Sequence, residues 1–322
     1  MITLSPYGNK NHQAGRGSEG AQSMTLRIGT SEAGGTFHTQ GVAIAGLFNR
    51  RPPGKEKCVV ETTLASFDNA NLFDRGEIQF GFMASNWIGR AKDGMPPFTR
   101  GIALRMVSPV NAGPVFFVTL AHSPIRTVGE LAGKRVAVGP QGAGMVEHVT
   151  TIFNVLGIPF DSFTPVYVSF ADGAEALIAG DVDAQFQRPI PNRVMTNLSE
   201  RAEVRVIPYA PGQIEKVLSE VSFYRGITIE KGAFRGVVED VPQLAVVNVL
   251  VTHERVQEEA VHDMVEAIIE NLDTLPQMNP LFKGLKDLFQ PLRSKGAAAL
   301  EMGGVPLHPG ALRAYREAGW LT

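Results

Sequence analysis

The chain has 322 residues, of which 44% are hydrophobic and 19% are charged, and its formal net charge at pH 7 is -2. These values favour a well-packed globular protein with two domains, and they exclude a global attraction to nucleic acid or to an anionic membrane. No stretch reaches the roughly 18 consecutive apolar residues of a membrane span, so we do not expect a membrane-embedded protein. Any charge selectivity must therefore be local to a site.

Residues 1–24 are rich in Gly, Asn, Gln and Ser, and they lack the apolar middle segment of a secretory signal. We therefore expect residues 1–24 to form a flexible tail. Two explanations stay open: the protein acts in the cytoplasm, or a signal peptide is missing from this sequence.

From Leu26 onward the sequence alternates predicted strands and helices. A strand at residues 26–29 is followed by the loop 30–35, by an amphipathic helix, and by a strand at residues 58–64 that contains the single cysteine, Cys58. Burial in this strand is favoured over a reactive thiol. The same order returns from residue 135, where a strand, a glycine-rich loop and an amphipathic helix follow one another. We interpret the two halves as a repeat of βα units with mainly parallel sheets.

Two apolar strands, at residues 114–120 and 245–251, are predicted to cross between the halves. The expected fold class is therefore α/β with two lobes, each a mainly parallel sheet flanked by helices, joined by two crossing strands. The predicted division is a tail at 1–24, lobe 1 at 25–115 and 246–322, and lobe 2 at 116–245.

Both glycine-containing loops lie between the end of a parallel strand and the start of a helix, which is the edge where ligands bind in open α/β sheets. The free N–H groups and the dipole of a helix N-terminus favour an anion there. Each loop alone is equally compatible with an ordinary tight turn, whereas the matched pair favours a binding cleft. The candidate ligand-binding residues of these loops are Thr30, Ser31, Gly35, Thr36, Phe37, Gly142, Ala143, Gly144 and Met145.

The ends of other strands supply further candidates. Arg188 follows a strand at residues 184–186, where a guanidinium can hold a carboxylate with two hydrogen bonds. An arginine at the rim that makes no ligand contact is an equal alternative. Ser85, Asn86 and Gln187 occupy comparable strand ends and can donate hydrogen bonds.

Sequence motifs of cofactor and catalytic sites are missing. The glycines of residues 139–144 have the spacing GxxGxG, not the GxGxxG of a dinucleotide site. The sequence has no GxxxxGKS/T, HExxH or GxSxG motif, and its seven histidines are scattered. We therefore predict no cofactor, no metal and no enzymatic activity.

Five segments together resemble the TAXI family, the TRAP-associated extracytoplasmic immunogenic solute receptors. They read GTSEAGGTF at 29–37, ELAGKRVAVG at 130–139, GAGM at 142–145, GDVDA at 180–184 and PLHPGA at 306–311. Their order along nearly the whole chain is similar to that of the family, whose motifs are GTGxxGGTYY, DLKGKRVxVG, GSGT, GxxDA and PLHPGA.

The resemblance implies a type II periplasmic binding fold that captures a small organic anion, such as an amino acid or a carboxylate, in a cleft between lobes. It also implies a periplasmic location and delivery of the ligand to TRAP-type membrane permease subunits. Two alternatives stay open. One is an enzyme on the same two-lobed fold, for example one like porphobilinogen deaminase or a pyrimidine-precursor synthase, and the other is a sensory binding module.

Overall fold

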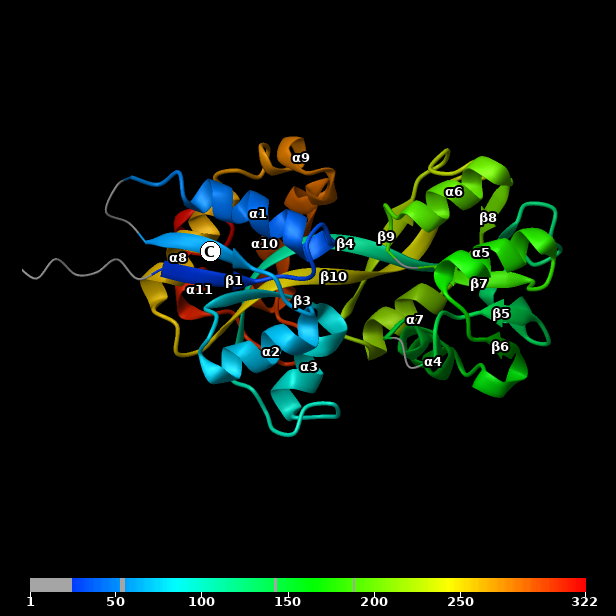
Figure 1. Ribbon diagram of the computed structural model, residues 1–322, viewed down its shortest axis with the longest axis horizontal. Helices are drawn as coiled ribbons and strands as arrows, with labels where there is room; N and C mark the ends of the chain where they lie inside the picture. Colours follow the sequence, from blue (N-terminus) through cyan, green and yellow to red (C-terminus); the bar gives the residue numbers. More distant parts are fainter. Residues whose placement is uncertain (1–24, 53–55, 142–143, 188) are drawn as a thin grey trace, which may run out of the picture.

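The computed structural model describes residues 25–52, 56–141, 144–187 and 189–322, and it has an α/β fold with two lobes (Figure 1). The strands in the described residues are β1 (Thr25–Gly29), β2 (Lys57–Glu61), β3 (Phe80–Ala84), β4 (Leu104–Leu120), β5 (Arg135–Ala137), β6 (Thr164–Val166), β7 (Ala184–Gln187), β8 (Val204–Val206), β9 (Tyr224–Ile229) and β10 (Val241–His253). The α-helices are α1 (Thr36–Phe48), α2 (Ser66–Arg75), α3 (Ser85–Asp93), α4 (Gly144–Leu156), α5 (Phe170–Ala179), α6 (Arg193–Arg201), α7 (Gln213–Glu220), α8 (Glu258–Ile269), α9 (Leu275–Met278), α10 (Leu292–Lys295) and α11 (Pro309–Glu317). Short 3-10 helices are η1 (Val128–Leu131), η2 (Phe160–Ser162), η3 (Pro280–Phe282), η4 (Leu285–Leu288) and η5 (Gly296–Ala299).

The strands form one mixed sheet in the order β2-β1-β3-β10-β4-β7-β5-β6, with β8 beside β4 and β9 beside β10. In the first lobe β1 is parallel to β2 and β3, and in the second lobe β5 is parallel to β6 and β7. The antiparallel strands β4 and β10 lie between these groups and join them. The predicted fold class is therefore confirmed.

The chain passes between the lobes along β4 and β10 (Figure 1). These strands have 17 and 13 residues, so each is longer than the crossing segment predicted from its apolar run. They pair with each other from Leu104 and His253 at one end to Val115 and Leu244 at the other. Because this strand pair continues from one lobe into the other, it forms a surface that both lobes share.

The buried apolar side chains form separate clusters in the two lobes. One cluster draws on residues 26–110 together with residues 247–321, so both ends of the chain build one lobe. The other two clusters draw on residues 115–246. The residues at which the lobes divide stay a prediction.

Helices cover both faces of each lobe. In Figure 1, α1 and α9 lie above the strands of the first lobe and α2 and α3 lie below them, while in the second lobe α6 lies above α5, and α4 and α7 lie lower. Among the residues that the structure describes, no helix has the length and apolar character that a membrane span requires.

The strand predicted at residues 58–64 ends earlier than its alternation indicated. β2 stops at Glu61, and Ala65 has a φ of +68°, a conformation that few residues other than glycine adopt. The last residues of the predicted strand, 62–64, therefore belong to the turn into α2, and Leu64 is 83% exposed. Local turn geometry overrode the period-two pattern here.

Candidate functional site

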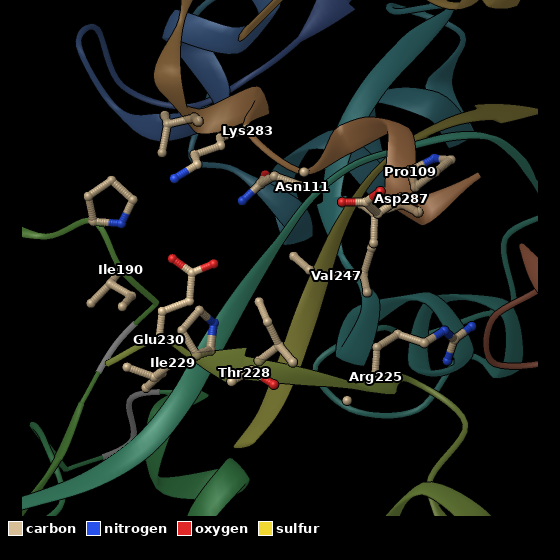
Figure 2. A pocket seen from close by; sticks show the side chains of 18 of the residues that line it. Pro109, Asn111, Ile190, Arg225, Thr228, Ile229, Glu230, Val247, Lys283 and Asp287 are labelled. Atoms are coloured by element: carbon tan, nitrogen blue, oxygen red, sulfur yellow. The ribbon is translucent and has the colours of Figure 1, made fainter. Parts of the chain in front are cut away.

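A cavity of about 870 Å³ lies between the lobes, on the side of the crossing strands that faces α1 and α6. Its floor is formed by residues 109–114 of β4 and by Val247 of β10. One wall consists of residues 190–196, β9 and residues 233–234 of the second lobe, and the other consists of residues 280–302 of the first lobe. Segments far apart in the sequence therefore meet at one site (Figure 2).

Most of the lining is apolar, and a few polar groups interrupt it. Pro109, Ile190 and Val247 are among the apolar side chains that surround the space in Figure 2. Large pockets of this kind, apolar with a few placed polar groups, are typical of small-molecule sites, whose volumes run from about 300 to 1,000 Å³.

Asn111 is the buried polar residue of the cavity floor, with 6% of its surface exposed. Its Oδ1 accepts hydrogen bonds from Nε2 of Gln40 and from Nδ2 of Asn248, each at 3.2 Å. These two bonds fix the orientation of the amide. Its Nδ2 has no acceptor within the described residues and points into the space between Lys283 and Glu230 (Figure 2).

Arg225 joins the two walls. Its guanidinium donates to the carbonyl oxygens of Ser222 at 2.7 Å and Tyr224 at 2.8 Å on its own lobe, and to that of Ala299 at 3.4 Å on the other lobe. Burial lowers the pKa of this guanidinium from its ordinary value. The carbonyl groups therefore occupy much of its donor capacity.

Three other charged side chains lie on the cavity walls with no ion pair to any described residue. Lys283 and Asp287 belong to the first lobe, and Glu230 follows β9 in the second lobe. All three side chains are exposed to solvent at the cavity walls.

The loop before α1 holds several residues that the sequence predicted to bind a ligand. Thr30 is fully buried, and its hydroxyl donates to the carbonyl oxygen of Glu61 at 2.8 Å. The hydroxyl of Ser31 accepts a hydrogen bond from the backbone N–H of His38 at 3.3 Å, and Gly35 is the residue before the first turn of the helix. Both hydroxyls therefore shape the loop in this conformation.

The first turn of α1 is more accessible. The side chain of Thr36 is exposed, and the backbone N–H groups of Thr36 and Phe37 have no acceptor in the described part of the chain. Thr36 lies one turn before Gln40 and therefore shares its face, so the free N–H groups begin one helical turn from the contact with Asn111. The ring of Phe37 is buried and stacks on Phe82 at a centroid distance of 5.4 Å.

Ser85 connects the lobes. Its buried hydroxyl donates to the carbonyl oxygen of Phe223 at 2.7 Å and accepts from the backbone N–H of Val247 at 3.2 Å. Asn86 is half-buried, and its side chain has no hydrogen bond to another described residue.

The remaining predicted residues belong to the second lobe. Gln187 is fully buried, its Nε2 donates to Oε1 of Gln185 at 2.9 Å, and its own Oε1 has no donor among the described residues. Gly144 begins α4, and Met145 packs against the core. Three predicted residues lie outside the described residues: Gly142, Ala143 and Arg188.

The structure therefore brings the start of α1 close to the cavity through Gln40, while the predicted residues described above do not line the cavity itself. Four residues of the lining were not predicted from the sequence: Asn111, Glu230, Lys283 and Asp287. For Asn111 a signal existed, because it is a lone amide within a long apolar run. The three charged residues have no local pattern that separates them from ordinary surface charges.

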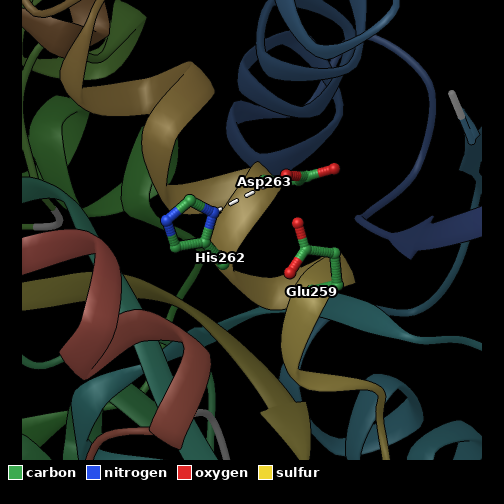
Figure 3. A group of neighbouring side chains, drawn as sticks. All are labelled: Glu259, His262 and Asp263. Atoms are coloured by element: carbon green, nitrogen blue, oxygen red, sulfur yellow. Dashed lines mark ion pairs between the residues drawn. The ribbon is translucent and has the colours of Figure 1, made fainter. Parts of the chain in front are cut away.

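A second cluster of polar side chains, Glu259, His262 and Asp263, has ligand atoms within 4.8 Å of one another (Figure 3). Each is already paired. Asp263 forms an ion pair with Arg51, Glu259 pairs with Arg313 at 2.5 Å, and His262 contacts Glu317 at 2.7 Å. The hydrogen bond from Arg313 lowers the pKa of Glu259. These contacts tie α8 to α11 and to Arg51, which follows α1, and the arginines supply the charge that a metal ion would otherwise provide.

Comparison with solved structures shows the same fold. A TctC solute binding protein from Polaromonas matches with a TM-score of 0.54 and 14% identity, over 92% of this chain and 96% of that one. A putative periplasmic sulfonate-binding protein, SsuA, from Methylobacillus flagellatus matches with a TM-score of 0.53 and 12% identity, over 92% of this chain and 88% of that one. At these identities the likeness concerns the fold.

A comparison with protein families identifies the family of the chain. The model of the NMT1-like family matches residues 28–319, which include both lobes, both crossing strands and every described residue of the cavity. The chain belongs to the NMT1-like family.

Proposed function

We propose that this protein is a solute-binding receptor that captures a small organic anion between its lobes and delivers it to a membrane transporter. The observation that carries the proposal is the cavity of about 870 Å³, whose walls come from different lobes and whose floor is the pair of crossing strands. A ligand held there contacts both lobes at once. Its binding therefore favours the closed arrangement over an open one, which is how a receptor signals occupancy.

Several groups near the cavity favour a negative charge. The N–H groups of Thr36 and Phe37 have no acceptor among the described residues and lie at the positive end of the α1 dipole, and Lys283 and the Nδ2 of Asn111 face the cavity. We propose that these groups hold the anion, and that the predicted loop residues and Arg188 add to its contacts when the lobes close around it. Each hydrogen bond to a charged group contributes about 1.5–3 kcal/mol, so a few of them account for micromolar binding, which corresponds to about 8 kcal/mol.

Neighbouring contacts support a hinge at the crossing strands. Arg90 of α3 pairs with Glu147 of α4 at 2.5 Å, and Ser85 bonds to Phe223 across the same boundary. These contacts lie on the side of α3 and α4, away from the cavity lining. Closure about the crossing strands can therefore narrow the cavity while the opposite side stays in contact.

We further propose that the receptor belongs to the TAXI group, works in the periplasm and serves TRAP-type permease subunits, as the sequence motifs suggest. Fractionation of cells that express the full natural gene tests the location. Recovery from the cytosol alone, together with the absence of upstream signal codons, would contradict export. We propose no enzymatic activity, because the cavity lining that we describe holds no nucleophile paired with a base.

A thermal-shift screen of amino acids, dicarboxylates and keto acids tests ligand binding directly. A ligand at about 100 times its Kd stabilises the folded state by about 2.7 kcal/mol, which for a protein of this size raises Tm by roughly 5 °C. The variants Lys283→Met and Arg188→Ala should reduce the shift produced by the best anion. Shifts with cations or sugars alone would refute the anion proposal, and an unchanged shift in either variant would remove that residue from the site.

A further inference from the structure

We infer that the cavity selects a zwitterion: a small molecule with a carboxylate at one end, an ammonium group beside it and an apolar body, with Asn111 and Glu230 as its specificity-determining residues. The inference rests on the proposed function and deepens it by naming the ligand class. It comes from the charged side chains of the lining and from the oriented amide of Asn111, which faces the cavity.

Asn111 defines the carboxylate position. Its Oδ1 already accepts from Gln40 and Asn248, so the amide cannot turn over without losing both bonds. The Nδ2 must therefore face the cavity as a donor, and it needs an acceptor once closure expels water. Lys283 lies on the adjacent wall with no ion pair among the described residues, so a carboxylate placed between them receives a hydrogen bond and a balancing charge.

Glu230 argues against a simple anion. Its carboxylate points into the same space as the nitrogen of Asn111, from the opposite lobe, and Asp287 adds a second negative charge to the lining. The donors of Arg225 are directed at carbonyl oxygens, and within the described residues it forms no ion pair with either carboxylate. A ligand with a carboxylate alone would leave Glu230 desolvated and unpaired on closure, whereas an ammonium group on the ligand would pair with it.

The apolar residues of the lining select an apolar body. Ile190, Ile229, Val247 and Leu288 surround the polar groups and offer no hydrogen-bonding side chain. A cavity of about 870 Å³ also exceeds what a carboxylate and an ammonium group fill by themselves. The ligand class is therefore an α-amino acid with an apolar side chain, or a molecule of the same layout.

Two sets of matched compounds test this by calorimetry on the full chain. The first is leucine, 4-methylpentanoate and 3-methylbutylamine, and the second is phenylalanine, 3-phenylpropanoate and 2-phenylethylamine. Within a set the body stays the same while one charged group is removed. We expect the zwitterion of at least one set to bind at least tenfold more tightly than both of its partners, which is about 1.4 kcal/mol.

Two variants test which residue contacts the carboxylate of the ligand and which contacts its ammonium group. Asn111→Asp keeps an oxygen that accepts from Gln40 and Asn248 but replaces the donor with a negative acceptor, so it should weaken zwitterion binding at least tenfold with little change in Tm. Glu230→Gln should weaken zwitterion binding towards that of the matched carboxylate, without weakening the carboxylate itself. Glu239→Gln, an exposed glutamate that does not line the cavity, is the control and should change none of these affinities.

The outcomes separate the inference from the proposed function. If a matched carboxylate binds as tightly as its zwitterion, or if Glu230→Gln leaves zwitterion binding unchanged, the inference is wrong while anion binding stands. If all six compounds fail but a dicarboxylate or a keto acid binds, the inference is likewise overturned alone. If no anion of either kind binds, both proposals fall.

Discussion

Substitution by alanine should change the free energy of unfolding in opposite directions at two glycines of α1. Gly46 lies in the helix interior, and a Cβ added there would meet nothing within 4 Å. A Cβ added at Gly41 would lie 2.5 Å from Cγ2 of Thr30 and 3.3 Å from the ring of Phe82. We therefore predict that Gly46→Ala stabilises the protein and that Gly41→Ala destabilises it.

The magnitudes follow from helix propensity and overpacking. Replacing glycine by alanine within a helix gains about 0.5–1 kcal/mol at either position. At Gly41 this gain is opposed by about 1–3 kcal/mol of overpacking. Thr30 cannot move its methyl group away without also moving the hydroxyl that donates to Glu61. The two variants should therefore differ by about 1–3 kcal/mol.

Thermal unfolding followed by circular dichroism measures this difference. For a chain of this size 1 kcal/mol corresponds to about 2–4 °C, so we expect Gly46→Ala to melt about 2–12 °C above Gly41→Ala, with the wild type between them. Gly41→Ala should also weaken ligand binding, because it displaces the start of α1 from Asn111, whereas Gly46→Ala should not. A Gly41→Ala protein that melts at or above Gly46→Ala would refute the packing argument.

Three further predictions concern buried groups. Ser85→Ala removes two hydrogen bonds at the lobe boundary and should lower the free energy of unfolding by about 2 kcal/mol. The exposed control Ser219→Ala should change this free energy by less than about 0.5 kcal/mol. Equal effects of the two variants would contradict the role of Ser85. Burial lowers the pKa of His148 from 6.5 to about 4, so the unfolded chain binds more protons between these values. The free energy of unfolding should therefore fall by about 3 kcal/mol as the pH drops from 6.5 to 4, and urea titrations of His148→Gln should show a flatter dependence. Burial raises the pKa of Cys58 to about 12, so an aromatic disulfide reagent at pH 8 should label this thiol only after unfolding in guanidinium, and rapid labelling of the native protein would contradict its burial.

Much of the architecture followed from local patterns. The apolar runs at residues 114–120 and 245–251 indicated the crossing strands, because a strand buried on both faces must be apolar throughout. The alternation of strands with amphipathic helices indicated parallel sheets, and β1–β3 and β5–β7 have that arrangement. Failures of the pattern were local, as at Ala65, where a turn with positive φ ended the strand early.

The candidate site was less accessible to such reasoning. Ser85 was identified correctly as a residue at the end of a strand, but its hydroxyl bonds to Phe223, which is 138 residues away in the sequence. A hydroxyl at the end of a strand predicts a hydrogen bond but does not identify the group that shares it. Here that group is a carbonyl oxygen of the other lobe, and not a bound ligand.

By itself, the sequence determined the alternation of strands and helices, the two crossings and the strand ends at which helices begin, since periodicity and turn residues act between near neighbours along the chain. Only the tertiary structure decided that Asn111, Glu230 and Lys283 face one cavity. They are separated by 119 and 53 residues, and no local pattern links them. Their charges meet because β4 and β10 carry the chain from one lobe to the other and back, and the packing of the C-terminal helices then places Lys283 opposite Glu230.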